Sequence, residues 1–217
     1  MQPIVSVIGK SNSGKTTLLE GLIAEFKRRG YRVAAVKHSR QEVELDTAGK
    51  DTWRFSRAGS ELTAISTSGI LGVFRRTDHD PGLPELSRAI GGGYDLILTE
   101  GFKKQEVSLK IEVHRREQGS DLVGKPEQLL AVVTDEPLGV AVPQFSRDDI
   151  NGIADLIEQT TLKKRNADDL DLFVNGAYLP TGTAFNAMLT RTLLAMIADT
   201  GYNTAVRDLS INMRRKN

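Results

Sequence analysis

A glycine-rich segment near the start of the chain constrains the fold more than any other feature. The residues Gly9-Lys10-Ser11-Asn12-Ser13-Gly14-Lys15-Thr16 have the spacing G-x-x-x-x-G-K-T, follow the apolar run Ile4–Ile8, and lead into a helical pattern over Thr16–Arg29. In a strand–loop–helix of this kind, successive backbone N–H groups surround a phosphate. The helix N-terminus adds positive potential at the same place. The sequence therefore predicts a nucleotide-binding loop, against the alternative of a plain glycine turn with a solvated lysine.

Each position of this loop has an expected role. The glycines let the backbone approach phosphate oxygens closely. Lys15 is expected to reach the β- and γ-phosphates and to act in catalysis, while the Thr16 hydroxyl is expected to bind Mg²⁺. The nucleotide-binding residues expected in this segment are Gly9, Asn12, Ser13, Gly14, Lys15, Thr16 and Thr17.

Composition excludes several other kinds of chemistry. The chain of 217 residues has no cysteine, which excludes disulfides, thiolate zinc sites, iron–sulfur clusters and cysteine nucleophiles. The net charge of +1 gives no overall field toward nucleic acid or an anionic membrane, so neither is expected as a partner. With no legible signal peptide and no apolar run of membrane-spanning length, we expect a soluble cytoplasmic protein.

Apolar, β-branched runs alternate with helical patterns along the first 160 residues. This order predicts an α/β fold, with a mostly parallel sheet covered by helices. A polar loop is expected at Glu42–Gly49. The expected strands are Ile4–Ile8, Arg32–Lys37, Leu62–Thr67, Ile70–Phe74, Tyr94–Thr99, Leu109–Val113, Leu129–Val133 and Gly139–Val142, and the expected helices are Thr16–Arg29, Lys50–Ser60, Leu83–Ile90 and Asp148–Thr161. Several polar segments follow these strands, so they are expected to meet at one rim of the sheet.

A carboxylate at the end of a neighbouring strand is needed to hold Mg²⁺ or its water. Glu100 ends the strand over Tyr94–Thr99 and is preferred to Asp95, which lies at the start of that strand. Glu100 is therefore expected to be a catalytic and metal-binding residue, and the N–H of Gly101 to approach the γ-phosphate. Asp46, in the loop after the second strand, is a further candidate for the metal shell.

A polar pair, Thr134-Asp135, follows the strand over Leu129–Val133 and is a candidate for reading the base. A carboxylate accepts hydrogen bonds from guanine N1–H and N2–H₂, which adenine lacks. The alternative is a turn residue before Pro137, because the full guanine signature N-K-x-D is absent. The charged run over residues 112–118 is predicted to be a solvated strand end rather than an anion site.

The charged stretch Leu162–Asp169 has no apolar period and is predicted to be a linker. It separates a nucleotide-binding domain over residues 1–162 from a small ββαβ module over residues 168–217. In that module, Asn175-Gly176 predicts a hairpin turn, Phe185–Ile197 has a helical apolar stripe, and Leu209, Ile211 and Met213 alternate as a last strand.

Six blocks together resemble the family of molybdopterin-guanine dinucleotide biosynthesis protein B. They are Gly9–Leu18, Arg29–His38, Asp46–Thr52, Ala58-Gly59, Thr99–Lys103 and Ala131–Asp135. The resemblance covers residues 1 to about 160 and implies a P-loop NTPase fold that binds GTP and Mg²⁺, with weak GTPase activity. It also implies a homodimer that works beside the molybdopterin guanylyltransferase, with molybdopterin as a further candidate ligand.

Two features depart from that family's pattern. Gln41 stands where members commonly have a second histidine three residues after the first, and the resemblance assigns no role to the C-terminal module.

No residue is convincingly placed to orient water or to act as an arginine finger; Gln105 and Arg75 are the nearest candidates. Slow hydrolysis by a nucleotide-dependent adaptor is therefore preferred to two alternatives, a P-loop kinase of a small metabolite and an interaction protein with a vestigial loop.

Overall fold

The computed structural model describes residues 2–39, 47–106, 108–119, 121–163, 170, 172–174, 177–202, 206 and 209. The chain forms two compact units, one of Met1–His38 with Gly82–Asn217 and one of Ser39–Pro81. The predictions for Gln41, for Asp46 and for most of the loop Glu42–Gly49 concern residues outside those described. The proposed boundary between domains falls beside residues 164–169, which also lie outside them.

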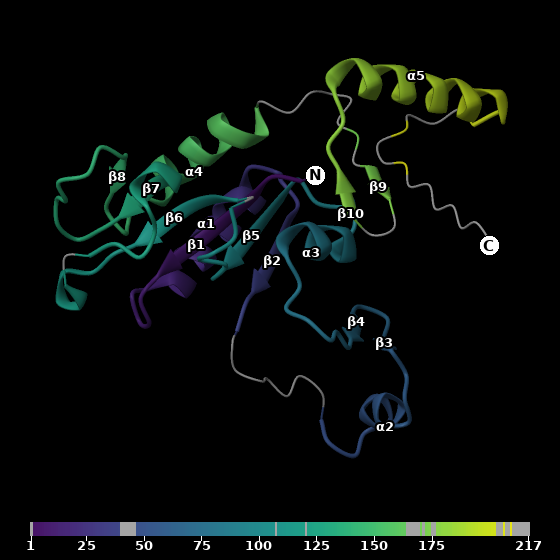
Figure 1. Cartoon of the computed structure of the whole chain (residues 1–217), viewed down its shortest axis with the longest axis horizontal. Coiled ribbons are helices and arrows are strands. Elements are labelled where there is room, and N and C mark those ends of the chain that lie inside the picture. Colours follow the sequence, from purple (N-terminus) through teal and green to yellow (C-terminus); the bar gives the residue numbers. More distant parts are fainter. Residues whose placement is uncertain are drawn as a thin grey trace. The chain divides into compact units, whose positions relative to one another are not determined.

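A six-stranded sheet forms the centre of the first unit (Figure 1). Its strands lie in the order β2 (Val33–Lys37), β5 (Leu96–Glu100), β1 (Ile4–Gly9), β6 (Leu109–Val113), β7 (Leu129–Val133) and β8 (Gln144–Phe145). Every neighbouring pair is parallel, as the alternation of strand and helix patterns predicted. All six residues of β1 are buried, which is typical of a parallel strand covered on both faces.

Alternate residues of the strands supply two separate apolar clusters. On one face, helices α1 (Lys15–Arg28) and α4 (Ile150–Ile157) pack on Val5, Val7 and their neighbours; α4 continues into the π-helix η3 (Glu158–Leu162). On the other face, helix α3 (Leu83–Ile90) packs on Ile4 and Ile97. Two short 3₁₀ turns, η1 (Arg116–Gln118) and η2 (Pro126–Gln128), precede β7.

A chain of buried hydroxyl groups crosses three neighbouring segments of the sheet. Thr99 Oγ1 donates to Ser6 Oγ at 2.8 Å, and Ser6 Oγ and Ser108 Oγ lie 2.8 Å apart. These polar groups are satisfied only when Ser6 lies opposite Thr99, which is the observed register. The same register places Val7 opposite Glu100, at the rim where the glycine loop Gly9–Thr16 begins.

An ionic network joins the C-terminal end of α1 to α4 and η3. Arg29 donates to Glu25 at 2.7 Å and to both Asp155 and Glu158 at 2.6 Å, and Tyr31 donates to Glu158 at 3.0 Å. Glu25 also accepts two hydrogen bonds from Arg28. The network fixes α1, the helix that follows the glycine loop, against α4 on the same face of the sheet.

The strand predicted over Gly139–Val142 is wrong. These residues are irregular, and the last strand of the sheet is Gln144–Phe145. Val140 and Val142 lie in a loop and pack against the cluster of Ile8, Leu129 and Val132, which accounts for apolar side chains at these two positions. The side chain of Gln144 bonds the backbone of Leu138 at 2.8 and 2.7 Å, which holds that loop in place without a sheet ladder.

The second unit contains helix α2 (Asp51–Arg57) and an antiparallel hairpin of β3 (Leu62–Ser66) and β4 (Leu71–Arg75). Both elements match the sequence-based expectation. Within residues 47–81, Thr63 is the one buried residue that the structure describes. The large apolar side chains exposed in this unit are Phe55, Leu62, Ile65, Ile70, Leu71 and Val73.

The C-terminal segment contains the antiparallel pair β9 (Leu172–Val174) and β10 (Ala177–Leu179), followed by helix α5 (Thr183–Asp199). These elements match the expected hairpin and helix. The turn at Asn175-Gly176 and the last strand over residues 209–213 fall on, or depend on, residues outside those described. Among the helices that the structure describes, none combines the length and apolar character needed to cross a bilayer.

Candidate functional site

The glycine loop joins the buried end of β1 to the first turn of α1, as the motif predicted. Gly9 has φ of +147°, and a Cβ there would lie 2.4 Å from the carbonyl oxygen of Val113, so only glycine fits. Asn12 and Gly14 also have positive φ, of 61° and 100°. The loop is closed by Lys15 Nζ, which donates to the carbonyl of Lys10 at 2.6 Å. The backbone is thus shaped as an anion cradle at a helix N-terminus.

The two residues expected to hold Mg²⁺ lie together at this loop. Thr16 Oγ1 donates to Glu100 Oε2 at 2.7 Å, and Lys37 Nζ lies 3.9 Å from Glu100 Oε1. Burial lowers the pKa of Lys15, while the nearby Glu100 carboxylate opposes that shift and the charges of Lys103 and Lys37 add to it. The ammonium groups of Lys37 and Lys103 thus act on that of Lys15, and the concentration of positive charge has capacity for a polyanion.

The role expected of the Gly101 amide differs from what the structure has. The Gly101 N–H donates to the carbonyl of Val7 at 3.0 Å, which extends the sheet rather than facing a phosphate. Gly101 and Phe102 both have positive φ, of 107° and 56°, and a Cβ on Gly101 would lie 3.2 Å from His38 Cβ. Gly101 therefore serves a tight turn that ends β5 just after Glu100.

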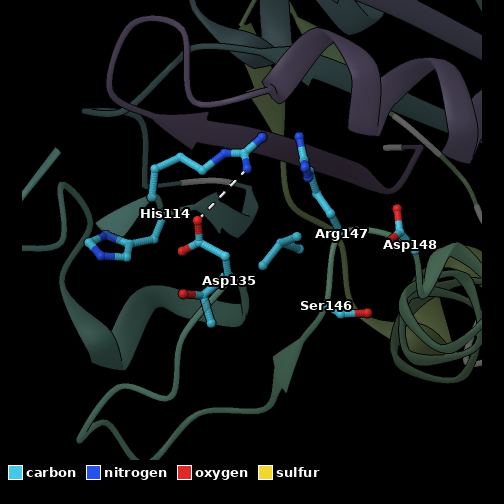
Figure 2. Close-up of a pocket in the computed structure, with 8 residues that line it drawn as sticks. His114, Asp135, Ser146, Arg147 and Asp148 are labelled. Atoms are coloured by element: carbon cyan, nitrogen blue, oxygen red, sulfur yellow. Dashed lines mark ion pairs between the residues drawn. The ribbon is translucent and has the colours of Figure 1, made fainter. Parts of the chain in front are cut away.

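The candidate base-reading pair lines a cavity of about 140 Å³ at the same rim. The lining residues are His114, Arg115, Val133, Thr134, Asp135, Ser146, Arg147 and Asp148. Thr134 Oγ1 accepts from Glu136 N–H and donates to the Glu136 carbonyl, so its hydroxyl shapes the turn. Figure 2 shows Arg147 extending from the end of β8, and its Cδ lies 3.9 Å from where a Cβ on Gly14 would be.

Asp135 is held as an anion in this cavity. Its Oδ1 accepts from the Arg116 N–H at 3.2 Å, and its Oδ2 lies 3.9 Å from Arg115 Nη1, the dashed line in Figure 2. The Arg116 N–H is the main cause of a lowered pKa at Asp135, with the charges of Arg115 and His114 adding to it. At neutral pH, Asp135 therefore presents a carboxylate that only accepts hydrogen bonds.

Sequence reasoning missed Arg115. The run over residues 112–118 was expected to be a solvated strand end, yet Arg115 is 20% exposed and its Nε donates to the Ser13 carbonyl at 2.9 Å. The available signal was topological, because β6 is parallel to β1 and Val113 lies opposite Gly9. A residue just after such a strand necessarily lies beside the loop that follows β1.

The residues of the rim fit a nucleotide with Mg²⁺. Among the described residues, two buried side-chain atoms have no hydrogen-bond partner, Ser13 Oγ in the loop and His114 Nε2 at the base cavity. In the same part of the chain there is no cluster of three or more His, Asp or Glu side chains suited to a metal ion. A cation here would therefore be held by Thr16 and Glu100 together with phosphate oxygens and water, as Mg²⁺ usually is.

Proteins of one known family resemble this chain. The sequence model of the family "Molybdopterin guanine dinucleotide synthesis protein B" matches residues 4–135. The molybdopterin-guanine dinucleotide biosynthesis adapter protein of Haemophilus influenzae is 37% identical over 157 residues, which are 72% of this chain and 88% of that protein. The adapter protein of the same name in Escherichia coli is 31% identical over 173 residues, 76% of this chain and 96% of its own.

Solved structures give the same assignment. A crystal structure of molybdopterin-guanine biosynthesis protein B aligns with a TM-score of 0.56 and 30% identity, over 72% of this chain and 99% of that one. The structure of Bacillus subtilis MobB aligns with a TM-score of 0.59 and 29% identity, over 73% of this chain and 98% of its own. This chain belongs to the family of molybdopterin guanine dinucleotide synthesis protein B.

Proposed function

We propose that this protein binds GTP with Mg²⁺ and acts as an adaptor in the synthesis of molybdopterin guanine dinucleotide. The observation that carries the proposal is the 2.7 Å hydrogen bond between Thr16 and Glu100 beside the glycine loop. A hydroxyl from the loop and a carboxylate from the neighbouring strand are the pair that holds Mg²⁺ against the phosphates in P-loop proteins. The names of the relatives from Haemophilus influenzae and Escherichia coli supply the pathway.

The phosphates would lie on the loop formed by Gly9, Asn12, Ser13, Gly14 and Lys15. Lys15 donates to a carbonyl of its own loop, so its ammonium is already directed into the cradle. Thr16 and Glu100 would hold the cation, and Thr17 would follow in the first turn of α1. Asp46 remains a candidate for the same shell. When bound, the cation would supply charge neutralisation at the phosphates.

Preference for guanine rests on Asp135. Its lowered pKa keeps it an acceptor, which complements the N1–H and N2–H₂ donors of guanine. Adenine offers no such pair of donors at that edge, so a carboxylate there disfavours it. We therefore propose Thr134-Asp135 as the turn that reads the base.

Slow hydrolysis and a homodimer complete the proposal. Lys15 and Glu100 supply charge and positioning, and a P-loop site without a water-orienting group or arginine finger turns over slowly. The hairpin of β3 and β4 exposes five large apolar side chains, and a unit with one described buried residue gains most from a second surface. We propose a second copy of this chain as that surface, and the molybdopterin guanylyltransferase and molybdopterin as further partners. A GTP-dependent step requires the compartment that supplies GTP, the cytoplasm.

Thermal unfolding with GTP, with ATP and without nucleotide, each with Mg²⁺, tests this function. We expect GTP to raise the unfolding temperature more than ATP, because ligand binding to the folded state stabilises it. Lys15→Ala should abolish the shift, while Lys27→Ala, at the far end of α1, should retain it. Equal shifts with GTP and ATP would favour a metabolite kinase, and no shift would indicate a vestigial loop.

A further inference from the structure

Residues 115–118 contact both the phosphate loop and the base-reading carboxylate. This segment, here called the 115–118 bridge, follows β6 and includes the turn η1. Among the described residues, no hydrogen bond runs directly between the glycine loop and Asp135. In the part of the chain that the structure describes, this short segment makes hydrogen bonds to both, while the Arg147 side chain lines the same cavity and lies near Gly14 without such bonds. The hydrogen bonds of the segment therefore bear on whether the two halves of the site act independently.

On the side of the phosphate loop, the bridge bonds two successive parts of the backbone. Arg115 Nε donates to the Ser13 carbonyl at 2.9 Å, and Gln118 Nε2 donates to the Ser11 carbonyl at 2.7 Å. Lys10 Nζ in turn donates to the Gln118 carbonyl. Arg115 Nη2 also lies 3.1 Å from the position of a Cβ on Gly14. The guanidinium of Arg115 therefore lies against the part of the loop that precedes Lys15.

On the side of the base, the same segment contacts the carboxylate of Asp135. The Arg116 N–H donates a hydrogen bond to Oδ1 at 3.2 Å, and Arg115 Nη1 lies 3.9 Å from Oδ2. A carboxylate has about four lone-pair positions, so a guanine edge can join the Arg116 N–H. The 3.9 Å ion pair with Arg115 is the weaker contact, and it is the one that a donor edge would replace.

We propose that Arg115 is a positioning residue that couples recognition of guanine to the grip on the triphosphate; this rests on the proposed GTP site. A guanine bonded to Asp135 replaces the ion pair between Asp135 and Arg115. The Arg115 guanidinium is then available to attract the phosphates beside Gly14. Adenine has no donor at N1 or C2, the edge that would face Asp135, and leaves the ion pair in place. The triphosphate is therefore held more tightly when the base is guanine.

Calorimetric titration of the full chain tests this coupling. It gives four dissociation constants, for GTP, ATP, GMP and AMP, each with Mg²⁺. We expect the GTP-over-ATP preference to exceed the GMP-over-AMP preference by about fivefold or more, within the usual range of coupling between sites. In Arg115→Ala the two preferences should become equal within about twofold. Arg115→Lys keeps the charge but not the planar fork that reaches Ser13 and Asp135 together, so it should also lose the coupling.

Arg116→Ala is the matched control, because it removes the neighbouring positive charge and keeps the backbone N–H that bonds Asp135. It should preserve the difference between the two preferences. The proposal is overturned if the wild-type protein favours GTP over ATP by the same factor as GMP over AMP. It is also overturned if Arg116→Ala loses the difference between these two factors as Arg115→Ala does, or if Arg115→Lys keeps that difference in full. If GTP is not preferred to ATP at all, the proposed function fails together with the coupling. Thermal unfolding checks that each variant is folded, and Arg115→Lys carries the test if Arg115→Ala is not.

Discussion

Thr16 and Glu100 are hydrogen bonded at 2.7 Å although 84 positions separate them in the chain. Thr16 lies in the first turn of α1 and Glu100 ends β5, and the parallel pairing of β5 with β1 brings the two residues to one rim. A hydroxyl and a carboxylate with hard oxygen atoms are suited to Mg²⁺. Their contact is therefore the place where the proposed binding of Mg²⁺ can be tested.

Glu100→Gln should weaken the binding of GTP with Mg²⁺ about tenfold, because the amide can still accept from Thr16 but carries no charge for the cation. Binding of GTP in EDTA should be unchanged or slightly improved. Calorimetric titration under both conditions measures the difference. Glu106→Gln, an exposed carboxylate after the same strand, should affect neither titration. A loss of equal size with and without Mg²⁺ would argue against a metal role for Glu100.

Asp135→Asn should invert the preference for the base. The asparagine amide can donate to the C2 carbonyl of xanthine, whereas it meets the guanine amino group with a donor of its own. We expect GTP affinity to fall at least about tenfold and xanthosine triphosphate to become the better ligand. Competition against a fluorescent nucleotide measures both. Unchanged selectivity would place base recognition elsewhere in the protein.

Gly9→Ala should destabilise the protein more than Gly30→Ala, although both glycines have positive φ. A Cβ on Gly9 would meet the backbone carbonyl of Val113 at 2.4 Å, whereas nothing lies within 4 Å of one on Gly30. We expect the difference in unfolding free energy to be about 2 kcal/mol or more, from backbone strain plus steric overlap. Urea unfolding of the two variants measures it, and equal costs would mean that Val113 moves freely.

Acid should weaken the junction between α1 and α4. Hydrogen bonds from Arg28 and Arg29 lower the pKa of Glu25 to about 2, from an ordinary value of 4.5. Because the folded pKa is the lower one, the stabilisation is complete above pH 4.5 and is lost as the pH falls toward 2. Glu25→Gln should therefore lower the unfolding temperature at pH 7, with a difference that shrinks below pH 4.5. Glu20→Gln, on the exposed side of α1, should show no such pH dependence.

Leu71→Asp should shift the protein from dimer to monomer, because Leu71 is 70% exposed on the hairpin proposed to meet a second copy. Sedimentation velocity at several concentrations measures the change. Leu179→Asp, which alters an exposed leucine of β10, is the comparison and should leave the association unchanged. A monomeric wild type, or equal effects of the two changes, would contradict the assignment of this hairpin.

The parts of the fold that could be predicted from the sequence have local signals. The strand–loop–helix around Gly9 is set by its glycines and flanking apolar runs, and the hairpin between Leu62 and Arg75 by alternation around a short turn. Glu100 could be found because parallel strands present their C-terminal ends at one rim.

The parts that could not be predicted depend on contacts between distant segments. Val140 and Val142 are apolar and so suggest a strand, yet they lie partly buried in a loop that the Gln144 side chain holds. From the sequence alone, Arg115 is predicted to be a surface charge. The pairing of β6 with β1 instead places its guanidinium on the Ser13 carbonyl. The amide of Gly101 is used by Val7, a partner that only the sheet register identifies.

The hydroxyl chain of Thr99, Ser6 and Ser108 has a consequence well beyond the interior of the sheet. A slip of β5 by one residue would leave these hydroxyls unmatched in an apolar layer and turn each side chain of the strand to the opposite face. Glu100 follows Thr99 directly, so the cost of mismatched hydroxyls keeps that carboxylate level with the loop. Alignment of the pair proposed to hold the cation is thus enforced from within the protein, by hydroxyl groups that lie inside the sheet.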